Sequence, residues 1–342
     1  MPQPQEHRHD GTIELAFAEL VARLEIAIAP FTGSGTGFPH EDARRGARWI
    51  ARAEALDLPG FGVAMLARDL RSAALDRSAG LASESAAAEV RALSSIDASG
   101  VPGPLALARA VREAGASAAA HGIGAVALRE VGALGVLGLA VRELALDGLV
   151  AVAVAQAPAA VAPWGGAAPV IGTNPIAFAA PRSAAAPLVV DFATSRATLA
   201  AVRAHAASGV ALPAGVALDA EGRPTTDPGA ASALLAEGRI ASLAGLLVEV
   251  LAGAAAGGRG TGAHPVDGRG ALLLALDPAS TGGLHAADVG AELSAAWTAS
   301  GGHLPARFDA LPLDPADETG AVRVSAAALH ELESASAGGA AA

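Results

Sequence analysis

Hydrophobic residues at helical spacing dominate the first part of the chain. The first stripe consists of Ile13, Phe17, Leu20, Val21 and Leu24. Each of these residues has another of the set three or four positions away, so they predict one helix, which Pro30 closes. A second helix is expected from about His40 to Asp57, and a third from Val63 to about Ala74.

The middle of the chain alternates between helical and extended patterns. Residues 104–120 form a helical stripe that begins with a proline and ends before Gly122, and a further helix is expected near 138–146. Short apolar runs at 123–128 and 149–154 predict buried strands. This alternation is typical of an α/β protein.

The segment 148–181 carries no charge, and its length raises the question of a membrane span. Its interior is interrupted by Pro158, Pro163, Pro169 and Pro175. In lipid these prolines would leave backbone polar groups unsatisfied, so we expect buried strands and turns and no membrane partner. Residues 1–10 have no apolar core of a signal peptide, and a cytoplasmic location is therefore expected.

The composition limits the chemistry that the chain can perform. With 52% hydrophobic and 17% charged residues in 342, it can bury a large core, as a soluble enzyme does. All 23 basic residues are Arg, and Cys and Tyr are absent, which excludes a Schiff base, a thiolate and a phenolic acid. The net charge of −11 argues against a nucleic-acid partner. The histidines lack the spacing of metal ligands, so we expect no metal site.

Two neighbouring segments carry the strongest signal in the chain. Residues 171–181 read Ile-Gly-Thr-Asn-Pro-Ile-Ala-Phe-Ala-Ala-Pro, and residues 188–195 read Leu-Val-Val-Asp-Phe-Ala-Thr-Ser. They resemble the GTNPxAxxxP and DxATS segments of the type 2 malate/L-lactate dehydrogenase family, whose members pass hydride between NAD(P) and 2-oxo or 2-imino acids. The loop at 212–228 resembles another segment of that family, and the likeness covers residues 104–255 well.

The resemblance implies a fold and a domain division. It implies an α/β fold unlike a Rossmann domain, with a largely antiparallel central sheet in a cofactor-type domain of residues 76–265. A second, discontinuous helical domain would comprise residues 12–75 and 266–333. The polar and low-complexity ends, 1–11 and 334–342, are expected to be mobile tails. The resemblance also implies NADH or NADPH as cofactor, a small-molecule substrate and a homodimer.

Two turns in the middle of the chain are the predicted cofactor-binding segments: Gly165, Gly166, Gly172, Thr173, Asn174 and Pro175. Backbone N–H groups and the Asn174 amide can hold a cofactor or a carboxylate, but a tight turn between buried strands explains the same residues. Trp164 can present a flat face to a ring or pack in the core.

Asp191 and His205 are the candidate catalytic residues. The resemblance gives an Asp at position 191 the task of organising the active site. Alternatively, Asp191, Thr194 and Ser195 cap the helix that follows them. His205 is the best surviving candidate for a general acid, because the pKa of His lies near neutral pH.

The positions where the family carries polar function read differently in this chain. The resemblance aligns two histidines of the family with Phe61 and Ala133. It aligns an arginine of the family with Met65 and a lysine with Ile240. We therefore predict an apolar substrate pocket of Phe61, Met65, Ala133 and Trp164. Two functions stay open: an NAD(P)H-dependent oxidoreductase of altered specificity, or a member without hydride chemistry. The second would be a cofactor-free cyclase, lyase or isomerase of an apolar biosynthetic intermediate, or a non-catalytic homologue.

The first prediction concerns the family's usual 2-oxo and 2-hydroxy acid substrates. Replacing the proton donors by Phe61 and Ala133 should cost on the order of 10²–10⁴-fold in rate. We expect only marginal turnover of malate, lactate, pyruvate and oxaloacetate in a spectrophotometric assay of the purified protein. Robust turnover of any of the four would show that positions 61–65 are misaligned with the family motif.

Overall fold

The computed structural model describes residues 11–33, 36–71, 90–261, 263 and 268–338. A six-stranded sheet forms its centre, in the order β2-β3-β11-β4-β6-β7. The strands are β2 (Leu93–Asp97), β3 (Ile123–Val131), β4 (Val150–Ala155), β6 (Ile176–Ala180), β7 (Leu188–Phe192) and β11 (Arg269–Leu276). Only β2 and β3 run parallel, and the other neighbours are antiparallel. The predicted α/β fold with a largely antiparallel sheet is thereby confirmed.

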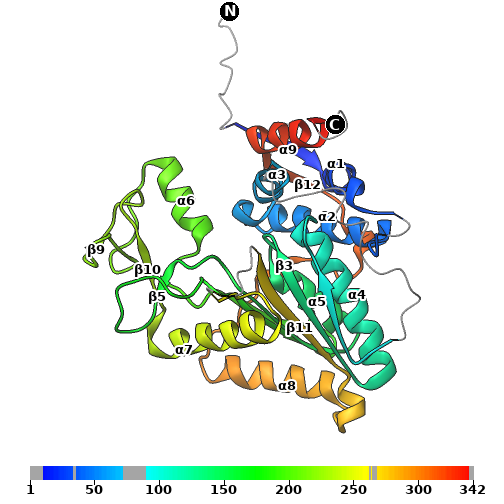
Figure 1. The fold of residues 1–342 in the computed structure, drawn as a ribbon. Helices are drawn as coiled ribbons and strands as arrows, with labels where there is room; N and C mark the ends of the chain where they lie inside the picture. Colours follow the sequence, from blue (N-terminus) through cyan, green and yellow to red (C-terminus); the bar gives the residue numbers. More distant parts are fainter. Residues whose placement is uncertain (1–10, 34–35, 72–89, 262, 264–267, 339–342) are drawn as a thin grey trace, which may run out of the picture.

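Strand β11 occupies the middle of this sheet although it comes late in the chain (Figure 1). Leu273 lies opposite Val126 of β3 on one side and Ala153 of β4 on the other. The expected domain division assigned residues 266–333 to the helical domain. Strand β11 belongs to this range and pairs within the central sheet, and the division as a whole stays a prediction. The sheet needs β11 to satisfy the inner backbone groups of β3 and β4.

The two faces of the sheet pack against different partners. On one face, α4 (Gly103–His121) and α5 (Leu137–Leu146) cover small side chains that alternate along the strands, such as Ala151, Ala153 and Ala177. The opposite face carries larger side chains that pack on α7 (Gly238–Val248) and the π-helix η4 (Glu249–Ala255): Val152, Val154, Ile176 and Leu272. The predicted helices and strands of this region are confirmed to within a few residues.

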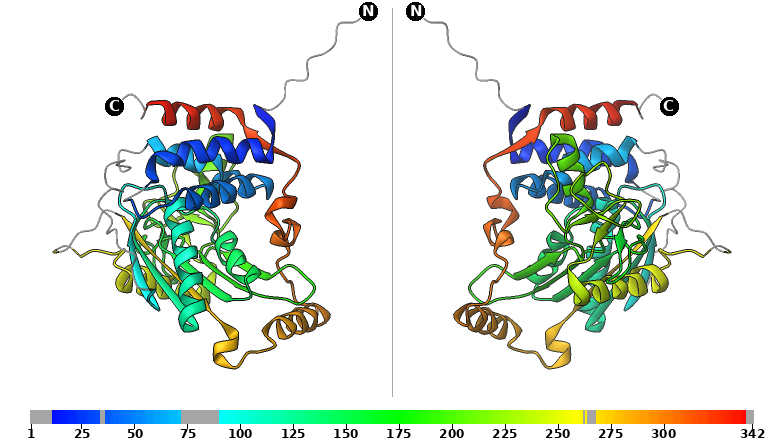
Figure 2. Two further views of the ribbon diagram at one scale, coloured as in Figure 1. Left: turned by 90° about the vertical axis from the view of Figure 1, so that its right-hand side faces the viewer. Right: turned by 90° about the vertical axis from the view of Figure 1, so that its left-hand side faces the viewer.

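A helical layer lies at the other end of the molecule (Figure 2). It contains α1 (Phe17–Ile28), η1 (Ala29–Phe31), α2 (His40–Ala55), η2 (Pro59–Phe61), α3 (Val63–Arg71) and α9 (Ala326–Gly338). Strand β1 (Thr12–Ala16) pairs with β12 (Ala321–Ser325) and brings the two ends of the described chain together. Ile13 was expected in the first helix, but it pairs with Val324 in this ladder.

The ends of two predicted elements differ from the structure or lie outside the described residues. The predicted C-terminal tail from 334 was wrong in its first residues, because α9 continues to Gly338. The expected end of the third helix, 72–74, lies outside the described residues, as does the N-terminal tail except Gly11.

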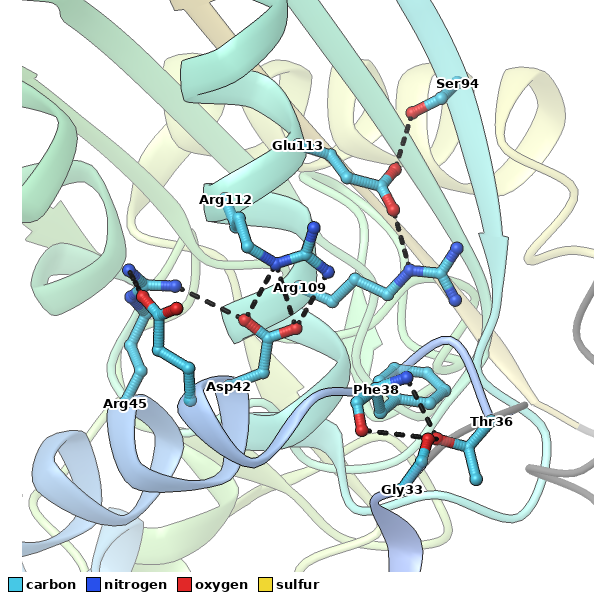
Figure 3. Close-up of polar contacts among 10 residues, drawn as sticks. Gly33, Thr36, Phe38, Asp42, Arg45, Ser94, Arg109, Arg112 and Glu113 are labelled. Atoms are coloured by element: carbon cyan, nitrogen blue, oxygen red, sulfur yellow. Dashed lines mark hydrogen bonds and ion pairs between the residues drawn. The ribbon is translucent and has the colours of Figure 1, made fainter. Parts of the chain in front are cut away.

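A buried carboxylate joins α2 to α4 (Figure 3). Asp42 is fully buried and accepts hydrogen bonds from Arg112 at 3.0 and 3.1 Å and from Arg45 at 3.3 Å. The Arg109 guanidinium lies 5.1 Å from the centre of the Phe38 ring and hydrogen-bonds Glu113. A buried charge is tolerable only when it is paired in this way, so the network fixes the helical layer against the sheet domain.

A smaller sheet and a helix stand to one side of the central sheet (Figure 1). The strand order is β5-β10-β8-β9. The strands are β5 (Val161–Ala162), β8 (Ala217–Leu218), β9 (Pro224–Thr225) and β10 (Ala233–Leu235), and α6 (Leu199–Ser208) accompanies them. The C-terminal part adds η5 (Pro278–Thr281), α8 (Ala286–Ala299), η6 (Arg307–Ala310) and η7 (Pro315–Asp317).

The uncharged segment 148–181 forms strands and turns, as predicted. In the described part of the chain, one helical stretch, Gly238–Ala255, is long and apolar enough to cross a membrane by length and composition alone. One side of this stretch packs on the central sheet, and Glu249 within it is held by polar partners. These contacts are those of a helix that covers a sheet.

Candidate functional site

Three segments that are distant in the chain meet beside α3. The Ala133 N–H donates to Asp69 Oδ2 at 3.0 Å, which ties the loop after β3 to α3. A Cβ atom on Gly135 would lie 3.7 Å from both Met65 Cε and the Phe61 carbonyl oxygen. The structure thus brings together the predicted pocket positions 61, 65 and 133.

The three pocket residues differ in their accessibility. Met65 is only 2% exposed and belongs to the main core, whereas Phe61 and Ala133 are half-buried at its edge. Met65 therefore belongs to the core, and the apolar wall consists of the partly exposed residues Phe61 and Ala133. Helix α6 lies close to them, since a Cβ on Gly60 would lie 2.8 Å from the Ala200 Cβ.

Asp191 caps a helix, but a different one from the helix that the sequence suggested. Its Oδ2 accepts a hydrogen bond of 2.7 Å from the Gly138 N–H in the first turn of α5. The N-cap residue of α5, Val136, has no side-chain acceptor, so Asp191 replaces the missing cap from β7. The following helix, α6, is capped by Thr198, which accepts from the Ala201 N–H.

The surroundings of Asp191 favour its protonated form. Burial raises the pKa of Asp191 to about 6, although the Gly138 N–H and the positive charge of Arg307 favour the carboxylate. Asp191 is consequently a carboxyl group that can hold a proton close to neutral pH. In the described residues no hydrogen bond or ion pair connects it to His205.

The turn at 172–175 is held by buried polar contacts. The Asn174 side chain has 0% exposure, and its Nδ2 donates to the Gly245 carbonyl at 3.0 Å and to Glu249 Oε1 at 2.8 Å. Its Oδ1 accepts from the Ala157 N–H at 3.1 Å. Because both amide hydrogens are donated within the protein, the Asn174 side chain has none left for a ligand. The tight-turn interpretation accounts for its place in this structure.

Glu249 is the centre of the contacts behind this turn. Its carboxylate also accepts from Gln156 Nε2 at 2.6 Å and from Arg259 at 2.8 Å. Burial opposes ionisation, but these hydrogen bonds outweigh it and the pKa of Glu249 is lowered. The Thr173 carbonyl accepts from the N–H and hydroxyl of Thr194, so the two motif segments are hydrogen-bonded to each other.

The Pro163–Gly166 turn lies at the surface. Trp164 is 61% exposed, so it does not pack in the core, and its place in the substrate pocket stays a prediction. The Trp164 N–H donates to Ser242 of α7, and the Gly166 N–H closes the turn on the Pro163 carbonyl. Whether Gly165 and Gly166 bind a cofactor stays a prediction.

His205 lines a hollow of about 390 Å³ between α6 and the smaller sheet. The lining residues are Ala193, Ser195, Arg196, Ala197, Thr198, Ala201, His205, Leu212, Pro213 and Val216. His205 Nδ1 lies 3.3 Å from the Val210 carbonyl oxygen, and Arg196 Nη1 donates to the Gly215 carbonyl. Ala193, which lines the hollow, lies only two residues after Asp191. The segment 188–195 therefore contributes the Asp191 cap of α5 and also part of the lining of this hollow.

The sequence interpretation missed Asp69, which holds the loop that carries Ala133. A signal was available, because Asp69 lies four residues after Met65 and therefore on the same face of a helix. Among the described residues there is no group of three or more His, Cys, Asp or Glu that could hold a metal ion.

Comparison with known proteins identifies the family. A solved structure of a Δ1-piperideine-2-carboxylate reductase from Pseudomonas syringae pvar. tomato superposes with a TM-score of 0.75 and 27% identity, covering 94% of this chain and 99% of that one. A dehydrogenase from Sinorhizobium meliloti gives 0.72 and 26%, covering 95% and 98%. The fold is thus that of known dehydrogenases and reductases. The family model described as malate/L-lactate dehydrogenase matches residues 32–303, so the chain belongs to this family.

Curated relatives are similar over parts of their length. The chain is 44% identical over 186 residues to a (2R)-3-sulfolactate dehydrogenase (NADP(+)) of Chromohalobacter salexigens, covering 51% of this chain and 56% of that protein. It is 31% identical over 286 residues to a Δ1-pyrroline-2-carboxylate reductase of Ancylobacter novellus, covering 80% and 82%. The chain spans a little over half the length of the first curated relatives that it matches, 56% and 61%.

The second prediction tests what Asp191 does. Because its pKa is raised from 3.8 to about 6 in the folded protein, the native state holds this proton more tightly than the unfolded chain, and stability falls as pH rises from about 4 to 6. Asp191→Asn keeps an acceptor for the Gly138 N–H but cannot ionise. Relative to wild type, this variant should gain up to about 3 kcal/mol between pH 4 and pH 7, at about 1.4 kcal/mol per pKa unit.

Urea unfolding at several pH values measures this difference. The control is Asp191→Ala, which loses the cap and should be less stable by about 1 kcal/mol at pH 4. A difference between Asp191→Asn and wild type that stays constant from pH 4 to 7 would contradict the raised pKa.

Proposed function

We propose that the protein is an NAD(P)H-dependent reductase of a small cyclic 2-imino acid. The observation that carries the proposal is that Phe61 and Ala133 occupy the two positions at which the family resemblance expects proton-donating histidines. The fold and family are shared with proteins named as pyrroline- and piperideine-2-carboxylate reductases, which supports an imine as the substrate.

The difference between an imine and a ketone explains why these positions can be apolar. Hydride addition to a ketone creates an alkoxide, which needs a nearby acid. A cyclic imine that enters in its protonated form already carries the proton on nitrogen, and hydride addition converts it directly into a neutral amine. An apolar wall at Phe61 and Ala133 is compatible with the second reaction and poorly suited to the first.

The hollow beside α6 fits a nicotinamide cofactor. It contains the positively charged Arg196 and the first turn of α6, a ten-residue helix whose N-terminus favours an anionic phosphate. Ser195 and Thr198 add hydroxyl groups at the same rim. NADH or NADPH bound in this hollow would supply the hydride, and Ser195, Arg196 and Thr198 would hold the cofactor there.

A second candidate function is a catalyst without hydride chemistry. The apolar residues at 61, 65 and 133 favour it, because a pocket without a fixed charge suits an uncharged intermediate. The two candidates differ in one requirement, the binding of a nicotinamide nucleotide.

We also propose that the protein is a homodimer. Large exposed apolar side chains lie on α7 with η4 and on α8, two helical segments that Figure 2 shows on different sides of the molecule. They are Ile240, Leu243, Leu246, Leu247, Val250, Val289, Leu293 and Trp297. A monomer rarely exposes so many large apolar side chains on its helices, and a second copy of the chain offers a surface that can cover them.

The third prediction separates the two candidate functions. Fluorescence titration should show saturable binding of NADPH or NADH, and Δ1-pyrroline-2-carboxylate should be reduced at least about 100-fold more efficiently than pyruvate. Phe61→His adds a proton donor and should raise pyruvate turnover more than imine turnover, whereas Phe61→Leu should not. A protein that binds neither nucleotide would support the second candidate.

The fourth prediction concerns the dimer. Light scattering coupled to gel filtration should give twice the chain mass of 33.3 kDa. Leu243→Glu combined with Leu247→Glu places two charges on the exposed side of α7 and should yield monomers. Ile26→Glu on α1 is the matched control, because Ile26 is exposed on a different helix. A wild-type protein that elutes as a monomer at micromolar concentration contradicts the proposal.

A further inference from the structure

Segments that carry three arginines converge near Asp69 of α3, since α6 contacts η2 just before α3 and β11 begins beside the end of β3. Arg68 and Asp69 are neighbours in α3, with Arg68 Nη2 3.4 Å from Asp69 Oδ1. Arg203 is in α6, and Arg269 begins β11. The backbone explains how they meet: Arg269 lies opposite Val131 at the end of β3, and the loop that follows is bound to Asp69.

The charges in this cluster are not balanced. Burial lowers the pKa of Arg203, and the neighbouring charge of Arg68 lowers it further, whereas Asp69 opposes the change. Burial also lowers the pKa of Arg269; Asp69 opposes this, and Arg68 and Arg203 add to it. Three positive charges thus face one negative charge in a protein whose net charge is −11.

The guanidinium groups of Arg203 and Arg269 have no hydrogen-bond or ion-pair partner within the part of the chain that the structure describes. The cluster around Asp42 shows the contrast (Figure 3). There Arg112 and Arg45 both reach the buried carboxylate, and Arg45 also pairs with Glu143. The positive and negative charges around Asp42 are paired and hold α2 against α4. In the cluster of Arg68, Arg203 and Arg269, the guanidinium N–H donors outnumber the carboxylate oxygens available to accept them.

We propose that Arg68, Arg203 and Arg269 form the binding site for the carboxylate of the substrate. The identity of the ligand as a substrate rests on the proposed function. A guanidinium offers two parallel N–H donors that match the two oxygens of a carboxylate, and several such groups hold it in a defined orientation.

The position of the cluster supports a substrate carboxylate as its ligand. Arg68 follows Met65 by one helical turn, and Asp69 holds the Ala133 loop, so the cluster adjoins the apolar wall formed by Phe61 and Ala133. A small imino acid has a charged carboxylate next to an apolar ring. The cluster supplies the charge that residue 65 lacks, and the wall accepts the ring.

Pyrrole-2-carboxylate is a suitable probe because it is planar, carries the carboxylate and cannot be reduced at an imine. Calorimetric titration, with and without NADPH, should show binding to the wild-type protein. Arg203→Gln and Arg269→Gln should each weaken it about 10- to 100-fold, the size expected for a lost charge-assisted hydrogen bond. Pyrrole-2-carboxamide, which lacks the charge, should bind equally to wild type and variants.

Arg44→Gln is the matched control, because it removes the same charge from an exposed position in α2. It should bind the probe as wild type does. Arg203 lies at the surface of α6, so Arg203→Gln keeps the test valid if Arg269→Gln fails to fold.

Three results overturn the proposal: no probe binding to wild type, equal binding to wild type and both variants, or variants that weaken NADPH relative to NADH but leave the probe unaffected. The last result would assign the cluster to the cofactor phosphate. Failure of the proposed function looks different, since the probe would still bind through the arginines while no nucleotide-dependent imine reduction occurred.

Discussion

The insertion of β11 between β3 and β4 is the constraint on which the rest of the structure depends. Both inner strands would have one unpaired edge without it, and unpaired backbone groups in a core are costly. Its pairing also places Arg269 beside the end of β3, and it gives η4 a surface on which to pack. The sheet is therefore complete only when residues 269–276 have joined strands formed more than a hundred residues earlier.

Charged residues are few in this chain, and their hydrogen-bond partners distinguish two kinds. Some are fully paired within the protein and hold elements together, whereas others have unpaired donors that a ligand can use. Asp42 and Glu249 are surrounded by as many donors as they can accept, so they hold elements together. The arginines around Asp69 exceed the carboxylate available to them. Donors that no protein group accepts remain available to a ligand, and the proposed carboxylate site rests on this excess.

The apolar wall and the arginine cluster together give one account of the divergent positions. Loss of a proton donor removes the means to stabilise an alkoxide, but it leaves the reduction of a protonated imine possible. Loss of the arginine expected at residue 65 removes one carboxylate contact, and the proposed site uses Arg68, one turn further along the same helix, in its place. Both changes act on the same small region, where α3, α6 and the loop after β3 converge.

The sequence by itself determined the local elements and the family. Periodicity located α2, α4 and β3, because burial of one face imposes a repeat that can be counted along the chain. The segments 171–181 and 188–195 identified the family, which the comparison confirmed. The tertiary structure alone decided contacts between distant residues. It paired Ile13 with Val324, turned Asp191 towards α5 and placed Arg269 opposite Val131, since these contacts depend on packing that no local pattern records.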